Sequence, residues 1–166
     1  MDVCVIDWWE TFKGWTPYIM GLVVLAIWFF QKQREVLAVE AKEVVKDLLE
    51  LSIINFDINF VGTHSKVEFE AKLLKFKEVS EKAHRSMLFI NNNKKIRNLK
   101  ELLESYYQYK ETVYHPINNT VRLADEIRII EFMQLQGTKD NARRLDKCIS
   151  EIIKILQPYS VYKKIL

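Results

Sequence analysis

The chain contains one long apolar stretch, followed by segments in which apolar positions recur with a helical period. Residues 15–30, WTPYIMGLVVLAIWFF, hold no charged side chain. A transmembrane helix needs ~20 mainly apolar residues, with ~17 tolerated. Aromatic residues border the stretch, as they do at the two surfaces of a bilayer. The pattern predicts one transmembrane helix over residues 15–31, with interface anchors at Trp8, Trp9, Trp15 and Trp28.

Two other interpretations of this stretch are a cleavable signal peptide and a buried core helix. A signal peptide has a basic N-terminal region and a cleavage site of small residues. Here the region before the stretch is acidic, and QKQREV follows it. A core helix would not explain WWETFKGW on one side and QKQR on the other, which are typical of membrane interfaces. A membrane span is therefore the favoured interpretation.

The flanking charges predict an orientation. Residues 1–14 carry three acids and one lysine, a net charge of −2, whereas Lys32 and Arg34 follow the stretch directly. Cytoplasmic flanks of membrane spans are enriched in Lys and Arg. We therefore expect a single-pass membrane protein. The frequent Ile, Lys and Asn are typical of an AT-rich genome, that of a bacterium or a phage. The predicted parts of the protein are an extracytoplasmic segment 1–14, the span 15–31, a cytoplasmic helical bundle 32–158 and a C-terminal tail 159–166.

The rest of the chain predicts an all-α fold, an antiparallel bundle of four or five helices. The membrane helix is expected to continue to about Leu51, and residues 55–65 to form a connection. Residues 52–61, SIINFDINFV, are the one stretch that also fits a strand. Asp47 is assigned to the solvent side of the continuing helix. Its predicted inward stripe is Val36, Val39, Glu40, Val44, Leu48 and Leu51.

Caps and turn residues place the other helices. Ser65-Lys-Val-Glu68 is a capping box that opens a second helix, which a turn at residues 91–93 ends. A third helix is predicted from Lys94 to about Val113, where Pro116 interrupts it. A fourth runs to Gln136 and ends at Gly137. A fifth, capped by Thr138 or Asp140, ends before Pro158.

The inward faces of these helices follow from the same periodicity. The second helix is predicted to bury Phe69, Leu73, Phe76, Val79 or Ser80, Ala83, Met87 and Ile90. For the third helix the predicted inward residues are Ile96, Leu99, Leu103, Tyr106 and Tyr107. For the fifth they are Leu145, Cys148, Ile149, Ile152, Ile153 and Leu156.

The sequence contains no recognisable catalytic or metal-binding pattern. His64, His84 and His115 stand singly, without a second ligand at helical spacing. Cys4 and Cys148 lie near opposite ends, which excludes a disulfide framework and a Cys-rich zinc site. We therefore expect no enzyme activity, no metal, no cofactor and no small-molecule substrate.

Two basic clusters, in residues 94–100 and 143–147, and four tyrosines in residues 106–114 are candidate partner surfaces. Basic residues with nearby aromatic rings can bind RNA. Tyrosines at helical spacing more often fill a core with the hydroxyl at its edge, and this is the favoured interpretation. The net charge of +3 over 166 residues is too small to indicate nucleic-acid binding by itself.

The architecture predicts a homo-oligomeric pore in the lipid bilayer. Small residues such as Gly21 and Ala26 allow close contact between membrane helices. A ring of bundles would gather the spans around a channel, and a hydrophobic constriction can gate such a channel by dewetting. The predicted pore lining is Thr16, Met20, Gly21, Val24 and Ile27. The predicted charges at the two mouths are Asp7 and Glu10 outside and Lys32 and Arg34 inside.

The short N-terminal span, the QKQRE exit, the long helix and the compact all-α bundle resemble the small accessory membrane proteins of type VI-B CRISPR systems. The resemblance covers the whole chain in layout and size. It implies a divergent HEPN-like bundle and an oligomeric pore that depolarises the inner membrane in RNA-guided antiphage defence. It also implies an RNA-guided effector complex, or its RNA, as a partner.

Ribonucleases of the HEPN type use an Arg followed four to six residues later by a His. No Arg precedes a His at that spacing in this chain, so no residue is carried over as catalytic. The alternative function is a non-conducting, membrane-anchored scaffold that recruits a cytoplasmic partner through its bundle.

Overall fold

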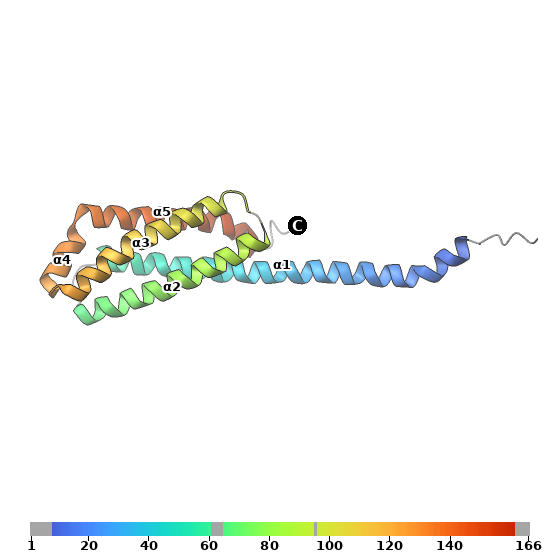
Figure 1. Ribbon diagram of the computed structural model, residues 1–166, viewed down its shortest axis with the longest axis horizontal. Helices are drawn as coiled ribbons and strands as arrows, with labels where there is room; N and C mark the ends of the chain where they lie inside the picture. The colour runs from blue at the N-terminus through green and yellow to red at the C-terminus, as the bar shows by residue number, and fades with distance from the viewer. Residues whose placement is uncertain (1–7, 61–64, 95, 162–166) are drawn as a thin grey trace, which may run out of the picture. The chain divides into compact units, whose positions relative to one another are not determined.

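The computed structural model describes residues 8–60, 65–94 and 96–161, and every regular element in these ranges is an α-helix. This confirms the all-α prediction for the described residues. The strand alternative for residues 52–61 is wrong over 52–60, which are helical. The helices are α1 (Trp8–Phe60), α2 (Lys66–Asn93), α3 (Leu99–Leu123), α4 (Glu126–Gln134) and α5 (Gln136–Ser160) (Figure 1).

The chain divides into two compact units, residues 1–36 and residues 37–166. Helix α1 contributes to both and is a single helix of 53 residues, so the predicted continuation of the first helix is confirmed. The predicted connection at residues 55–65 is wrong for residues 55–60, which form the end of α1. Residues 61–64 lie outside the described part of the chain.

The second unit is a bundle in which α2 and α5 contact the C-terminal part of α1, and α3 packs against α2 and α5 (Figure 1). The short helix α4 joins α3 to α5 at the end of the bundle where α2 begins, and the backbone N–H of Lys66 donates to Glu126 Oε1 there at 3.1 Å. A single core of aliphatic and aromatic side chains fills the space between the helices.

The inward face of α1 differs from the predicted stripe. Val36 and Val39 are 45% and 59% exposed, whereas Ala38 and Ala41 are buried together with Val44, Leu48 and Leu51. Small side chains allow a close approach of helices, and a pattern search that weights large aliphatic residues misses them. Asp47 is 4% exposed, which contradicts its predicted place on the solvent side.

Ion pairs fix the pairing of α1 with α2. Three acids on α1 meet three lysines on α2 in antiparallel order, with the earliest acid beside the latest lysine. The pairs are Asp47–Lys82, Glu50–Lys75 and Asp57–Lys72. This order excludes a shifted register, because a shift by one turn would leave the buried carboxylate of Asp47 without its ammonium partner.

Helix α2 follows the sequence prediction closely. Its buried residues are the seven that were predicted, with Ser80 as the buried member of the Val79 or Ser80 alternative. The capping box is confirmed: Ser65 Oγ accepts from the N–H of Glu68, and Glu68 Oε2 accepts from the N–H of Ser65. The predicted turn at residues 91–93 is wrong, because the helix continues through Asn93, whose side chain donates to the Phe89 carbonyl at 2.8 Å.

Helix α3 begins later and ends later than predicted. Asn98 has φ 66°, a left-handed conformation that no helix interior contains, so α3 starts at Leu99 and not at Lys94. Pro116 lies inside α3, which contradicts the predicted interruption. Val113 and Ile117 are both buried, and this packing on either side of the proline keeps the chain helical.

The last two helices meet at Leu135. Asp125 caps α4 by accepting from the N–H of Arg128 at 3.0 Å. Helix α4 ends at Gln134, and Gly137 lies in the first turn of α5, so its predicted role as a helix end is wrong. Thr138 and Asp140, the predicted caps, also lie within α5. That helix continues through Pro158 to Ser160 and not, as predicted, only to the residue before the proline.

Candidate functional site

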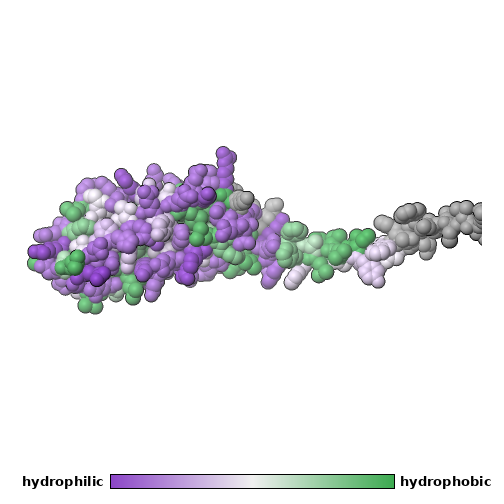
Figure 2. Space-filling model, viewed as in Figure 1, coloured by the Kyte–Doolittle hydropathy of each residue, from purple (hydrophilic) through white to green (hydrophobic). Residues whose placement is uncertain are grey.

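The apolar part of α1 is the candidate functional site. Among the described helices, α1 is the one that is long and apolar enough to cross a membrane. Every side chain from Trp15 to Phe30 is exposed, including Tyr18 at 72% and Leu22 at 67%. Figure 2 shows hydrophobic side chains covering this part of α1, while hydrophilic side chains dominate the visible face of the bundle. The exposure distinguishes the segment from the core helix of a soluble protein.

The segment has two faces that differ in aromatic content. At 100° per residue, Thr16, Met20, Val24 and Ile27 lie on one face of α1, with Gly21 at its border. The opposite face carries Tyr18, Leu22, Leu25 and Phe29, two of which are aromatic. The predicted pore-lining residues therefore share a face, apart from Gly21.

The flanking residues are described in part. Trp15 and Trp28 are 63% and 60% exposed, as interface anchors would be. Lys32 and Arg34 are exposed, and Lys32 Nζ lies 3.4 Å from Glu35 Oε2. Asp7 lies outside the described residues. The backbones of Trp8, Trp9 and Glu10 belong to α1, but their side chains lie outside the described part.

The two described histidines, His84 and His115, lie in different environments. Within the described ranges no three His, Cys, Asp or Glu side chains lie close enough together to hold a metal ion. The His84 ring stacks with Tyr106 and meets the Tyr107 ring at a tilt of 45°. Burial, assisted by the charge of Lys110, lowers the pKa of His84. His115 is exposed and its Nε2 lies 2.6 Å from a Glu111 carboxylate oxygen. His64 and Cys4 lie outside the described residues.

A polar network that the sequence pattern did not reveal joins α1 to α5. Asn55 Nδ2 donates to the Ala142 carbonyl at 3.0 Å, and Ser52 Oγ donates to Asp146 Oδ1 at 3.1 Å. Asn59 Nδ2 donates to Asn55 Oδ1 at 3.1 Å. Burial raises the pKa of Asp146, and the hydrogen bonds from Asn55 and Ser52 offset only part of that rise.

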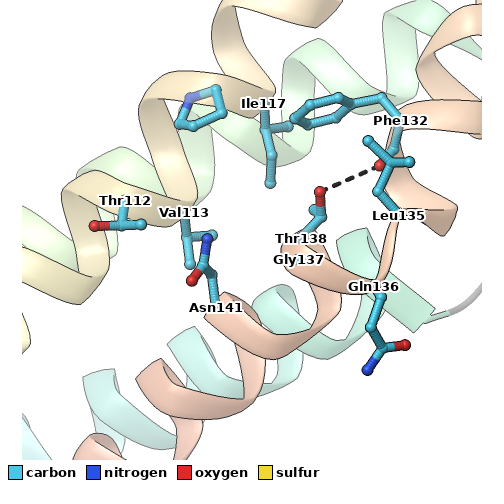
Figure 3. Close-up of a pocket in the computed structure, with 10 residues that line it drawn as sticks. Thr112, Val113, Ile117, Phe132, Leu135, Gln136, Gly137, Thr138 and Asn141 are labelled. Atoms are coloured by element: carbon cyan, nitrogen blue, oxygen red, sulfur yellow. Dashed lines mark hydrogen bonds between the residues drawn. The ribbon is translucent and has the colours of Figure 1, made fainter.

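Two cavities border α5, and the sequence pattern predicted neither of them. One of about 440 Å³ lies between α3 and the junction of α4 with α5 (Figure 3). Its walls are mostly apolar, from Val113, Pro116, Ile117, Phe132 and Leu135. It lies beside Pro116 of α3 and the break between α4 and α5 at Leu135.

The second cavity, of about 250 Å³, lies between α3 and the middle of α5. We name it the α3–α5 cavity. It brings together one tyrosine of the tyrosine run and two members of a basic cluster, which the sequence had placed 35 residues or more apart. Its lining residues are Leu102, Ser105, Tyr109, Arg144, Lys147, Cys148 and Glu151.

The tyrosine run is divided by the fold. Tyr106 is fully buried and its hydroxyl donates to the Ser80 carbonyl at 3.1 Å, whereas Tyr107 is 51% exposed. The prediction that Tyr107 points inward is therefore wrong. Cys148 is buried, as predicted for a core residue, and its thiol donates to the Leu102 carbonyl at 3.6 Å.

Comparison with known proteins found no family model, no curated protein and no solved structure that matches this chain.

Proposed function

We propose that this protein is a single-pass membrane protein that assembles into a homo-oligomeric pore. One observation carries the proposal. The helix α1 combines a fully exposed apolar segment with a C-terminal part that supplies core residues of the bundle, such as Leu48 and Leu51. Such a helix supports more than tethering, because contacts between bundles would also gather the membrane segments.

The two faces of the apolar segment support a pore over a simple anchor. The face with Thr16, Met20, Val24 and Ile27 carries no aromatic ring, which suits a narrow, hydrophobic channel lining. The opposite face carries Tyr18, Leu22, Leu25 and Phe29, which suit contact with lipid. In this proposal residues 1–14 lie outside, the bundle lies in the cytoplasm, and Lys32 and Arg34 form a basic ring at the inner mouth. The resemblance to the CRISPR accessory proteins further implies that the pore acts in the inner membrane, in antiphage defence.

The experiment compares one acidic substitution on each face. Val24→Asp is on the proposed lining, and Leu25→Asp is its neighbour on the proposed lipid face. An Asp at the centre of a lipid-exposed helix costs about 3 kcal/mol, so Leu25→Asp should reduce the membrane-bound fraction. Val24→Asp should insert normally and shift the reversal potential of channels in planar bilayers toward cation selectivity.

The wild-type chain supplies the second measurement. Purified protein in detergent should have the mass of a ring of many copies and should conduct in planar bilayers. A monomer or dimer without conductance would overturn the pore and leave the anchored scaffold. Equal insertion defects in Val24→Asp and Leu25→Asp would overturn the assignment of the lining face.

A further inference from the structure

The α3–α5 cavity gathers polar side chains that the proposed pore does not use. Helices α3 and α5 run antiparallel, so Tyr109 lies toward Arg144, and Ser105 lies beside Lys147 and Cys148. Glu151 lies at the other end of the α5 side, seven residues from Arg144, which is about 10 Å along a helix.

The cations of the cavity are available to a ligand. The neighbouring Arg143 is paired, with its Nη1 3.3 Å from Asp140 Oδ1. Among the residues that the structure describes, Arg144 and Lys147 form no such ion pair or hydrogen bond, and neither do the hydroxyls of Ser105 and Tyr109. Two positive charges and two hydroxyl donors thus border the α3–α5 cavity, and none of them is used in an ion pair or hydrogen bond within the described structure.

The chemistry of these groups fits a phosphate. A guanidinium offers parallel N–H donors that match phosphate oxygens, an ammonium adds a point charge, and hydroxyls complete the set. The carboxylate of Glu151 at the far end would accept from a hydroxyl or amino group of the same ligand. The volume of about 250 Å³ limits the ligand to about the size of a mononucleotide or a sugar phosphate.

The cavity lacks an activated nucleophile. Burial raises the pKa of the Cys148 thiol to about 11, so the group stays a neutral thiol at physiological pH. A neutral thiol is a poor nucleophile, and its S–H is directed to the Leu102 carbonyl. The arrangement is therefore suited to binding and release rather than to covalent chemistry.

We infer that the α3–α5 cavity binds a small phosphate monoester, with the phosphate at Arg144 and Lys147 and a hydrogen-bond donor of the ligand at Glu151. This inference does not depend on the pore, because it concerns the bundle alone. The same phosphate chemistry occurs in a lipid headgroup, and the test separates the two sources.

The test is calorimetric titration of the full chain in non-ionic detergent at low salt. The probes are ribose 5-phosphate, adenosine monophosphate, inorganic phosphate and adenosine. We expect saturable binding of both monoesters with one site per chain, weaker binding of inorganic phosphate and none of adenosine. The double variant Arg144→Gln/Lys147→Gln should weaken monoester binding at least tenfold, since it removes two charge-assisted contacts.

A matched control removes the same charges from the same helix outside the cavity. Arg143→Gln/Lys154→Gln should change the affinity less than twofold. All four replaced side chains are exposed, and the melting temperature of each variant verifies that it is folded. Equal losses in both double variants would overturn the inference in favour of unspecific attraction. Binding of adenosine as tight as that of its monophosphate, or no saturable binding of any soluble monoester, would also overturn it. A parallel sedimentation assay uses vesicles that contain phosphatidic acid. Binding confined to these vesicles would overturn the soluble ligand and assign the site to a lipid headgroup.

Discussion

Replacement of Lys82 by Met tests how α1 is held in the bundle. Lys82 Nζ lies 2.9 Å from Oδ1 of Asp47, a carboxylate that is 4% exposed. The second oxygen of Asp47 is buried and has no hydrogen-bond partner among the described residues. Lys82→Met keeps the aliphatic stem but leaves this carboxylate without a countercharge.

The expected loss of stability follows from the two exposures. Removing one partner of a buried ion pair costs about 3–5 kcal/mol. The Lys82 side chain is 56% exposed, so water reaches the vacated side of Asp47 and reduces the loss to about 2 kcal/mol. For a bundle of this size that loss lowers the melting temperature by about 8 °C.

Thermal unfolding of the full chain in detergent, followed by circular dichroism, measures this effect. Lys75→Met on the same helix is the control, because its partner Glu50 is partly exposed and water replaces the ammonium there; we expect a shift of at most about 2 °C. The double variant Asp47→Asn/Lys82→Met should recover at least half of the loss. Equal shifts for Lys82→Met and Lys75→Met would refute the assignment of Asp47 as a buried charge that depends on Lys82.

Three further predictions concern the bundle. Burial raises the pKa of Asp146 above its unfolded value, so the folded state is favoured below the unfolded pKa and loses that advantage as pH rises through the folded pKa. Asp146→Asn should therefore gain stability relative to wild type as pH rises from 3 to 7, as measured by thermal melts across that range. A stability difference that stays constant with pH would contradict this prediction. Tyr106→Phe removes the hydroxyl that donates to the Ser80 carbonyl and should lower the melting temperature by about 4 °C, the equivalent of about 1 kcal/mol. Pro116→Ala supplies an N–H for the Thr112 carbonyl inside α3 and should raise the melting temperature by about 4 °C or more; a lowered value would show that α3 requires the proline.

The parts of the fold that sequence analysis predicted correctly are those in which local chemistry decides the outcome. In α2, the capping box at Ser65 and one uniform apolar row gave the start and all the buried positions. The helix ends were wrong where tertiary packing overrides a local signal. Pro116 and Pro158 both lie inside helices. Around Pro116, buried Val113 and Ile117 stabilise the helical path, and Pro158 follows buried Leu156 in the last turn of α5. Asn98 provides the opposite case, since a single left-handed residue moved the start of α3.

The candidate sites divide in the same way. The apolar segment and its bordering tryptophans are local features, and the sequence was enough to find them. The α3–α5 cavity depends on which helices are neighbours, and neither the basic cluster nor the tyrosine run carries that information. The antiparallel register that sets Tyr109 near Arg144 follows from the packing of α3 against α5 and from the turn that α4 makes between them.

The polar residues of α1 limit which part of that helix can cross a bilayer. Each charged side chain at the centre of a membrane helix costs about 3 kcal/mol, and Lys32, Arg34 and Glu35 follow the apolar segment within two turns. Farther along, Asp47 and Asn55 are buried, and they form hydrogen bonds with Lys82 of α2 and the Ala142 carbonyl of α5. Lipid would offer those groups no partners. The helix α1 is therefore divided by chemistry: residues 15–30 are suited to lipid, and the part that holds Asp47 and Asn55 is suited only to the bundle.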